Sequence, residues 1–360
     1  MVSYAPLVPE LGAAQMALNL ARALSDRGHE VVSWWPGHAP ESLRWWNGWL
    51  WRRQRLEDYL QETPPFDLID LPPLAISRRI ADRARLVARS VQPDLLYYLE
   101  DGRAALKSFS FSSAVHLLHG ARLNAAVLRA LRRASLIFCL GTAEREWMHR
   151  RLPWVRTRLA SYFNALRREE QAALSRIREA RAAAAGPGLR FLWIGRWTPH
   201  KGTARLVRFV TERLASRPQD SFTIAGTGPV ALNPFPAGLL AEGRVRLVPS
   251  FERGELPALL RSHDAGLFTS TVEGWGLSLN EMLESGMPVF ATEAGGVRDL
   301  RSYFPRSLLP FPPPLEIDFA ACRESDLAGY YREFTWERIA ELYEKEILHR
   351  VFQKASGGSS

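Results

Sequence analysis

Residues 270–281 read STVEGWGLSLNE, and this stretch decides how the sequence is interpreted. It follows an apolar segment typical of a buried strand and opens an apolar-periodic segment typical of a helix. Gly274 and Gly276 let a ligand approach the backbone closely, and a helix start offers unpaired N–H groups that favour a phosphate. Glu273 stands before this helix and Glu281 within it. The pattern predicts a phosphate site with a carboxylate at each end. The same residues would also occur if Glu273 were only a helix cap and Glu281 only a surface residue of the helix.

A second segment, residues 192–202 (LWIGRWTPHKG), places two cations on the turn after another apolar stretch. Ligands of α/β proteins bind at the carboxyl ends of parallel strands. Arg196 and Lys201 would neutralise a diphosphate there, unless they are solvated loop charges. Lys201 is one of only four lysines in an arginine-rich chain. A third turn, residues 226–229 (GTGP), also follows an apolar stretch and could bring backbone near a ligand.

Apolar runs alternate with helical patterns along the whole chain, which predicts an α/β fold with parallel sheets. In the first half we expect strands at 2–5, 30–35, 67–71, 94–99, 114–119, 135–140 and 158–162. In the second half we expect strands at 189–194, 221–225, 245–249, 265–270, 288–292 and 307–311.

The glycines and proline near residue 187 mark a boundary between two domains. We expect domains over 1–187 and 188–335, a last helix over 336–355 that packs back toward the N-terminal domain, and a disordered tail over 356–360.

The three segments, in this order, resemble the retaining glycosyltransferases of family 4, also described as glycosyl transferases group 1. That family has the GT-B fold, in which two Rossmann-like domains face each other across a cleft. The resemblance is nearly continuous over residues 189–300 and looser in the first half, where residues 12–31 look like the first helix of the family. The matching positions are Gly195, Arg196, Lys201, Gly202, Gly226, Gly228, Ser270, Glu273, Gly274, Trp275, Gly276, Glu281, Gly286, Pro288, Val289, Gly295 and Gly296.

The resemblance implies a role for each matching residue. Arg196 and Lys201 would hold the donor diphosphate, and the amides of Gly276, Leu277 and Ser278 would cradle its distal phosphate. Glu273 would bind hydroxyls of the transferred sugar, and Glu281 the ribose. His119, expected at the end of a strand, would approach the sugar from the other domain. The remaining expected donor-binding residues are Gly12, Gly226, Gly228, Gly274 and Trp275.

The reaction implied is the metal-independent, retaining transfer of a hexose-type sugar from a nucleotide-diphosphate donor to a glycan or lipid-linked acceptor held by the N-terminal domain. No Asp-x-Asp occurs in the sequence, so we expect the protein's own cations to act on the diphosphate, with no metal site and no cofactor besides the donor. The alternative is a catalytically silent homologue that binds a nucleotide-sugar or a partner protein.

The formal charge of +9 falls entirely within residues 1–187. It suits a solvated basic surface, an anionic membrane surface or a phosphate-bearing acceptor. Nucleic acid is not expected as a partner, because no RNA-binding signature accompanies the arginines.

Six of the twelve tryptophans lie between Trp34 and Trp51, the last of them just before Arg52 and Arg53. They suit a membrane interface, stacking on sugar rings, or a core beneath a long connection. The two cysteines, Cys139 and Cys322, lie in apolar surroundings and suit reduced thiols of a cytosolic protein. We therefore expect a cytoplasmic protein, with a peripheral position on the inner face of the membrane as the alternative.

Overall fold

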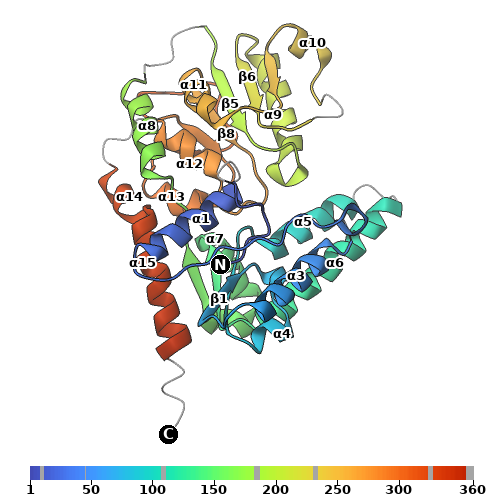
Figure 1. Cartoon of the computed structure of the whole chain (residues 1–360). Coiled ribbons are helices and arrows are strands. Elements are labelled where there is room, and N and C mark those ends of the chain that lie inside the picture. The colour runs from blue at the N-terminus through green and yellow to red at the C-terminus, as the bar shows by residue number, and fades with distance from the viewer. Residues whose placement is uncertain are drawn as a thin grey trace. The chain divides into compact units, whose positions relative to one another are not determined.

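The computed structural model describes residues 1–8, 12–44, 46–106, 111–181, 187–229, 234–322 and 327–353. The chain forms two compact units, of which unit 1 comprises Met1–Ala165 and Phe334–Ser360 and unit 2 comprises Leu166–Glu333 (Figure 1). Trp45 and the expected disordered tail over 356–360 lie outside the described residues.

Unit 1 is built on a four-stranded parallel sheet with the order β1-β2-β3-β4. The apolar faces of its helices pack around strands whose side chains are almost all buried. In chain order its elements are α1 (Gly12–Ser25), α2 (Glu41–Arg44), α3 (Gly48–Glu62), β1 (Leu68–Leu71), η1 (Pro73–Ala75), α4 (Arg78–Ala81), β2 (Arg85–Arg89), α5 (Asp94–Leu106), α6 (Phe111–Leu131), β3 (Leu136–Leu140), α7 (Thr142–Arg151), η2 (Pro153–Arg158), β4 (Leu159–Tyr162), α15 (Trp336–Ile347) and η5 (Leu348–Gln353).

Two of the predicted strands of unit 1 are wrong. Residues 94–99 begin α5 and residues 114–119 lie inside α6, while β2 was not predicted. A short apolar run fits a buried strand and a helix equally well. Exposure separates the two, because Leu99 and Leu118 are 44% and 63% exposed, as outward positions of a helix are. The predicted strands 2–5 and 30–35 reduce to one bridge between Val2 and Trp34.

The last helix, α15, packs on the N-terminal part of unit 1. Its Tyr343 ring stacks on Phe138 of β3, with ring centroids 3.7 Å apart. Its Glu344 accepts hydrogen bonds from Arg27 and pairs with His29 Nε2 at 2.8 Å, just after α1. The helix begins where Thr335 caps it by accepting from the Arg338 N–H. The end of the chain thus belongs structurally to the unit that contains its beginning.

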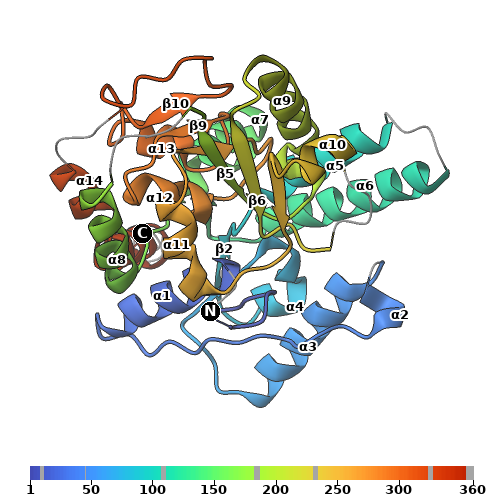
Figure 2. The same cartoon turned by 90° about the horizontal axis from the view of Figure 1, so that it is seen from above.

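Unit 2 contains a six-stranded parallel sheet with the order β10-β9-β8-β5-β6-β7 (Figure 2). Each of the six predicted strands of the second half corresponds to one of these strands. The elements are α8 (Arg168–Glu179), β5 (Arg190–Ile194), η3 (Pro199–Lys201), α9 (Thr203–Ser216), β6 (Ser221–Ala225), α10 (Ala237–Ala241), β7 (Val245–Val248), η4 (Arg253–Glu255), α11 (Leu256–Arg261), β8 (Ala265–Phe268), α12 (Leu277–Glu284), β9 (Val289–Ala291), α13 (Val297–Arg301), β10 (Leu308–Pro310) and α14 (Ala328–Glu333).

The helix α8 belongs to unit 2, so the unit begins at Leu166 and not after residue 187. The Arg178 guanidinium donates to the Glu284 carbonyl at 3.1 Å. Arg181, just beyond the helix, donates to the carbonyls of His263 at 2.8 Å and Ser285 at 3.0 Å. These contacts hold the segment against α11 and α12, so the boundary predicted near residue 187 falls inside unit 2.

The strand order of unit 2 locates a binding edge. From β5 the chain proceeds to β6 and β7 on one side, and then crosses to β8, β9 and β10 on the other. The carboxyl ends of β5 and β8 therefore flank a topological switch point, which is where open α/β sheets bind ligands. The loops that follow these two strands are the two segments with which the sequence argument began.

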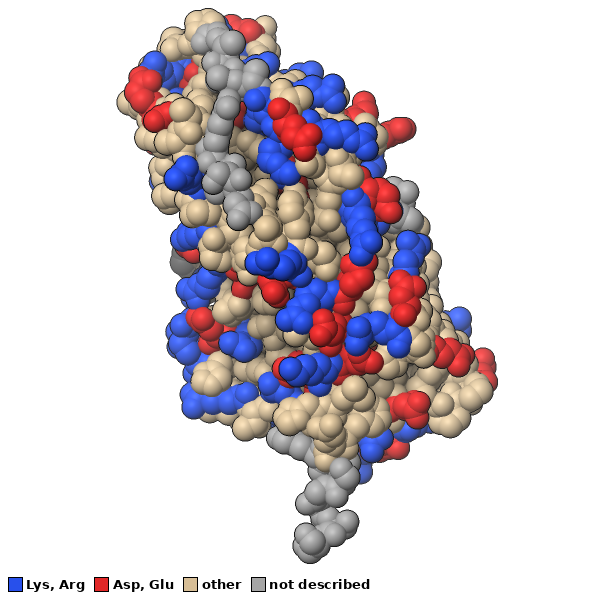
Figure 3. All heavy atoms as spheres, turned by 90° about the vertical axis from the view of Figure 1, so that its left-hand side faces the viewer, with Lys and Arg blue, Asp and Glu red and all other residues tan. Residues whose placement is uncertain are grey.

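Charged side chains of both signs are intermixed on the face of the molecule in Figure 3. Among the described residues, many charged side chains form ion pairs, such as that between Arg27 and Glu344. The formal excess of positive charge is therefore not spread as a uniform basic coat over this face. Any role for the basic residues has to be argued from particular clusters.

Candidate functional site

The loops after β5 and β8 are tied to each other by a chain of hydrogen bonds. The Trp193 indole donates to Thr269 Oγ1 at 3.0 Å, and this hydroxyl donates to the Lys201 carbonyl at 2.8 Å. The Thr271 N–H donates to the His200 carbonyl at 2.7 Å. Because the loops are joined through their backbones, residues at the two strand ends keep a fixed relation to each other.

Glycine is required where these loops touch. Gly202 has φ +71°, and a Cβ there would lie 1.9 Å from the Thr269 carbonyl oxygen. Gly276 has φ +91°, and its Cβ would lie 2.7 Å from the Phe268 ring. Both positions combine a left-handed backbone with a close approach, which only glycine tolerates without strain. The two glycines thus bring Lys201 and the start of α12 to the same edge of the sheet.

Lys201 and Glu273 form an ion pair at this edge. The Lys201 ammonium donates to Glu273 Oε2, and the Ser270 hydroxyl donates to the same oxygen at 3.1 Å. The side chains are 21% and 15% exposed, so the pair is half-buried but open to a ligand. A cation suited to phosphate and a carboxylate suited to hydroxyl groups therefore lie side by side.

Arg196 is exposed on the same loop, before η3. The pKa of the nearby His200 imidazole is lowered, first by burial and then by the positive charge of Lys201; Arg196 lowers it further, while Glu273 opposes the change. All three charges act on one ring. Arg196, Lys201 and Glu273, which the sequence analysis selected, are thus within electrostatic range of one residue.

The start of α12 is shaped by the buried Trp275 side chain. Its indole donates to Asn280 Oδ1 at 2.9 Å, and its carbonyl accepts from the Gly296 N–H at 2.9 Å. A Cβ at Gly296 would lie 2.8 Å from the indole. Trp275 therefore supports the turn from inside, while Leu277 and Ser278 in the first helical turn are half-buried. Gly274 and Gly276 on the same turn are buried.

Glu281 lies further along α12, and its side chain is nearly inaccessible, at 4% exposed. Its carboxylate accepts from Arg253, which also donates to Glu170 Oε1 at 3.0 Å. Arg167 donates to that same Glu170 oxygen at 2.9 Å. Burial raises the pKa of Glu281 to about 7, and the Arg253 charge opposes the rise.

The partners of Glu281 were not predicted from the sequence. Arg253 belongs to a short helical turn with the capping pattern formed by Glu252 and Glu255, which was the only local signal near it. Glu170 reaches Arg253 from α8. Ion pairs between such distant segments leave no trace in local spacing.

The turn after β6 is held open by two left-handed glycines, Gly226 and Gly228, with φ +74° and +70°. Their N–H groups donate to the carbonyls of Val248 and Pro249 at 2.8 and 2.9 Å. Among the described residues, a Cβ on Gly228 would meet nothing within 4 Å. This turn therefore has free space at the position where the sequence analysis expected backbone near a ligand.

The expected position of His119 is wrong. It was placed at the end of a strand, but it lies within α6, where its ring centroid is 5.0 Å from that of Trp46. The residue that follows a strand in this region is Ser90, directly after β2. Gly12, which the resemblance implies as a donor-binding residue, is the first residue of α1.

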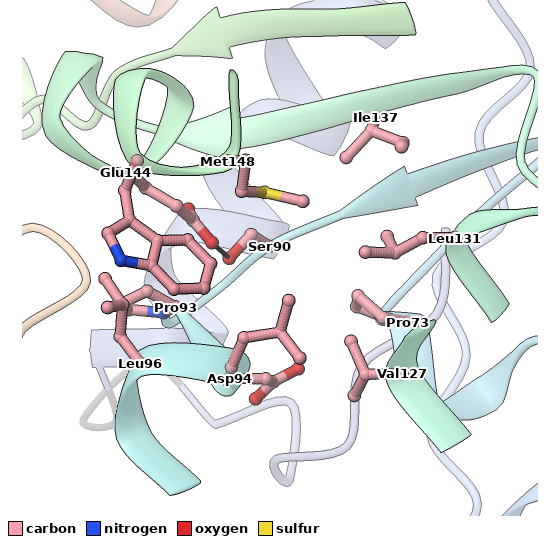
Figure 4. A pocket seen from close by; sticks show the side chains of 12 residues that line it. Pro73, Ser90, Pro93, Asp94, Leu96, Val127, Leu131, Ile137, Glu144 and Met148 are labelled. Atoms are coloured by element: carbon pink, nitrogen blue, oxygen red, sulfur yellow. Dashed lines mark hydrogen bonds between the residues drawn. The ribbon is translucent and has the colours of Figure 1, made fainter. Parts of the chain in front are cut away.

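A second cluster of polar groups lies at the carboxyl ends of β2 and β3 in unit 1 (Figure 4). Glu144 of α7 accepts from the Ser90 hydroxyl at 2.7 Å and from the Leu140 N–H at 2.8 Å. Asp94, the first residue of α5, lines the same small apolar pocket. Burial raises the pKa of both carboxyl groups to about 7, and the hydrogen bonds oppose the rise. Glu144 therefore connects two strands and a helix by hydrogen bonds, and the free-energy cost of burying its carboxyl group depends on whether that group is charged.

This cluster predicts a pH dependence of stability. Because the folded-state pKa of Glu144 is raised above its usual 4.5 to about 7, the folded state holds this proton more tightly than the unfolded state does. The stabilisation is fully present below pH ~4.5 and is lost as the pH rises to ~7. Urea unfolding of Glu144→Gln should show a weaker fall in stability across this interval. Glu146→Gln, in the same helix, is the control, and an unchanged slope in Glu144→Gln would contradict the assignment.

In the described part of the chain, no group of three or more His, Cys, Asp or Glu side chains is placed to hold a metal ion. None of the described helices combines the length and the apolar character that a membrane span needs. Cys139 and Cys322 are both buried, and they are not joined by a disulfide.

Comparison with known proteins finds a similarity in the second unit. Residues 188–304 match the family model described as glycosyl transferases group 1. An uncharacterized glycosyltransferase of Bacillus subtilis (strain 168), YqgM, is 28% identical over 113 residues, which span 31% of this chain and 32% of that relative. The chain thus matches about a third of the curated relative.

Solved structures extend the likeness to the whole chain at the level of the fold. Anabaena Alr3699/HepE, in complex with UDP and glucose, has a TM-score of 0.60 and 18% identity, covering 97% of this chain and 98% of that one. WaaG, a glycosyltransferase involved in lipopolysaccharide biosynthesis, has a TM-score of 0.60 and 15% identity, covering 98% and 99%. The α/β prediction is therefore confirmed: the chain has the GT-B fold, and its residues 188–304 are similar to the glycosyl transferases group 1.

Proposed function

We propose that the protein is a glycosyltransferase that moves a hexose-type sugar from a nucleotide-diphosphate donor to an acceptor, with retention of the anomeric configuration. The observation that carries the proposal is the ion pair of Lys201 and Glu273 at the carboxyl ends of β5 and β8. A diphosphate at the start of α12 would draw on Lys201 and Arg196, and Glu273 would take hydroxyls of the sugar. The complexes of HepE with UDP and with UDP-glucose support a donor of this class.

The chemistry required of these residues is mainly electrostatic. The bond between the anomeric carbon and the distal phosphate oxygen breaks, and the acceptor oxygen bonds to that carbon. The acceptor proton passes to the departing phosphate. Negative charge therefore grows on the diphosphate, where the ammonium of Lys201, the guanidinium of Arg196 and the N–H groups at the helix start stabilise it. We propose that these protein groups meet that need without a metal ion.

The acceptor is proposed to be a glycan or a lipid-linked glycan, held by residues of unit 1, and the protein to work in the cytoplasm or at the inner face of the membrane. Two observations support this part. The excess of positive charge lies in the first half of the chain, and arginines of unit 1 stack on its tryptophans, as Arg122 does on Trp46 at 5.2 Å.

Glu273→Gln is expected to lower transfer activity about 10- to 100-fold, because a hydrogen bond to a charged partner contributes about 1.5–3 kcal/mol. The variant keeps the size of the side chain and removes the charge that pairs with Lys201. Donor turnover is measured with a panel of nucleotide-sugars, with Glu212→Gln on the exposed side of α9 as the control. Full activity of Glu273→Gln would refute the site. Nucleotide binding by a wild-type protein that turns over no donor would instead favour the catalytically silent homologue.

A further inference from the structure

A groove in unit 1 gathers four arginines from three helices and a fifth from the residues just after one of them. Arg53 comes from α3, Arg78 from α4, and Arg122 and Arg129 from α6, while Arg133 follows just after that helix. The groove has a volume of about 410 Å³. We name it the arginine groove; Trp49, Leu50, Leu74, Ile76, Ser77, Ala126 and Ala130 complete its lining. The three helices lie together at the same side of unit 1 (Figure 1).

The spacing along α6 explains why the groove is both basic and open. Arg122, Ala126, Arg129 and Ala130 recur at intervals of three and four residues, so they share one face of the helix. The two alanines are buried, at 8% and 2% exposed. Their small side chains keep the floor low between the arginines. The same face therefore presents cations at the rim and apolar surface at the bottom.

Two of the guanidinium groups are held in place without being neutralised. Arg122 donates to Asn47 Oδ1 at 3.0 Å and to the Trp46 carbonyl at 3.2 Å. Arg53 and Arg122 lie over the Trp49 ring, 5.1 and 5.7 Å from its centroid. Cation–π contacts and hydrogen bonds to neutral acceptors hold Arg53 and Arg122 in place. Because none of these partners is negatively charged, the positive charge of both arginines is not neutralised.

Among the described residues that line the groove, none is acidic. Within the described ranges, only Arg78 of the five arginines forms an ion pair, and its distance to Asp82 is 3.9 Å between highly exposed side chains. Like charges gathered in one groove repel one another. Such an arrangement is favourable once an anion enters, because a phosphate accepts hydrogen bonds from several guanidinium groups together.

We propose that the arginine groove binds the phosphate-bearing headgroup of an anionic lipid. A free phosphate would need only the cations, but this groove also offers an apolar floor and an indole wall, which match the part of a lipid next to its headgroup. This proposal adds a lipid-binding site to the membrane position named in the proposed function. It rests on the proposed function only for the idea that the acceptor is lipid-linked. Binding to lipid is measured without turnover, so the two ideas can fail separately.

The test is co-sedimentation of the full chain with vesicles of phosphatidylglycerol and phosphatidylcholine, compared with vesicles of phosphatidylcholine alone. Arg129→Glu with Arg133→Glu reverses two exposed charges of the groove. The matched control is Arg150→Glu with Arg151→Glu, two exposed residues at the end of α7 in the same unit. We expect the groove variant to bind anionic vesicles at least about 30-fold more weakly than wild type, because each lost basic residue near an anionic surface costs ~1 kcal/mol and the introduced glutamates add repulsion. The control should lose clearly less.

Three results would overturn the proposal. Equal binding of wild type to both kinds of vesicle removes the role of charge, and equal loss in both double variants shows that net charge acts without the groove. Calorimetry with glycerol 3-phosphate gives the third: saturable binding of this soluble ester, lost in the groove variant, together with no binding to anionic vesicles, would assign the groove to a free phosphate. Nucleotide binding by each variant is measured in parallel, and its retention shows that unit 2 is intact.

Discussion

Lys201→Ala is expected to reduce transfer activity by about 10²–10³-fold, the loss typical of removing one group that stabilises charge in a transition state. The ammonium group of Lys201 is held at the binding edge by its ion pair with Glu273. The Lys201 backbone is held there by the hydrogen bond that the Thr269 hydroxyl donates to the Lys201 carbonyl. The charge of Lys201 matters most when the diphosphate departs, so kcat should fall more than KM rises. Steady-state kinetics with the best donor measure both parameters.

Lys345→Ala is the matched control, because it removes the same side chain from an exposed position of α15. It should leave kcat within about twofold of wild type, as surface substitutions away from a site do. Lys201→Arg is informative as well: a guanidinium keeps the charge but has a different shape, so partial recovery is expected. A Lys201→Ala protein that is folded and fully active would show that the cation has no part in the reaction.

The fold of unit 2 could be predicted from the sequence because each strand is a compact apolar run that ends at a glycine or polar turn. The segments around Phe191 and Leu267 are buried on both faces of the sheet, so they appear as continuous apolar runs. Because parallel strands end at one edge, the turn that carries Lys201 and the turn that carries Glu273 could be expected on the same side. Their direct pairing depends on β5 and β8 being neighbours, which only the strand order reveals.

Unit 1 was harder to predict for a physical reason. Its helices α5 and α6 contain stretches such as residues 94–99, in which apolar side chains follow one another without a clear period. The same ambiguity led to the wrong position for His119. By contrast, β2 begins with the exposed Arg85 and ends with the buried Arg89. Because a charged residue stands at each end of its short apolar run, the strand was not predicted from the sequence. Burial of an arginine is decided by its partner, which lies far away in the sequence.

That partner supports the last prediction. Arg89 is fully buried, and its guanidinium donates to Asp70 Oδ1 at 2.7 Å and to the Val2 carbonyl at 3.2 Å. The Tyr343 hydroxyl of α15 donates to the other oxygen of Asp70. One carboxylate thus joins β1, β2 and the C-terminal helix. Asp70→Ala should lower the free energy of unfolding of unit 1 by about 3–5 kcal/mol, because it leaves a buried cation without its counter-charge.

Hydrogen–deuterium exchange of the β1, β2 and β3 amides measures this loss within unit 1, whatever unit 2 does. Asp82→Ala is the matched control: its ion pair with Arg78 spans 3.9 Å between side chains that are 70% and 85% exposed, so a change within about 0.5 kcal/mol is expected. Tyr343→Phe removes one hydrogen bond and should cost about 1 kcal/mol. If Asp70→Ala costs no more than Asp82→Ala, the buried pair does not hold the unit together. If Tyr343→Phe leaves exchange unchanged, the C-terminal helix is anchored by the ring stacked on Phe138 and not by its hydroxyl.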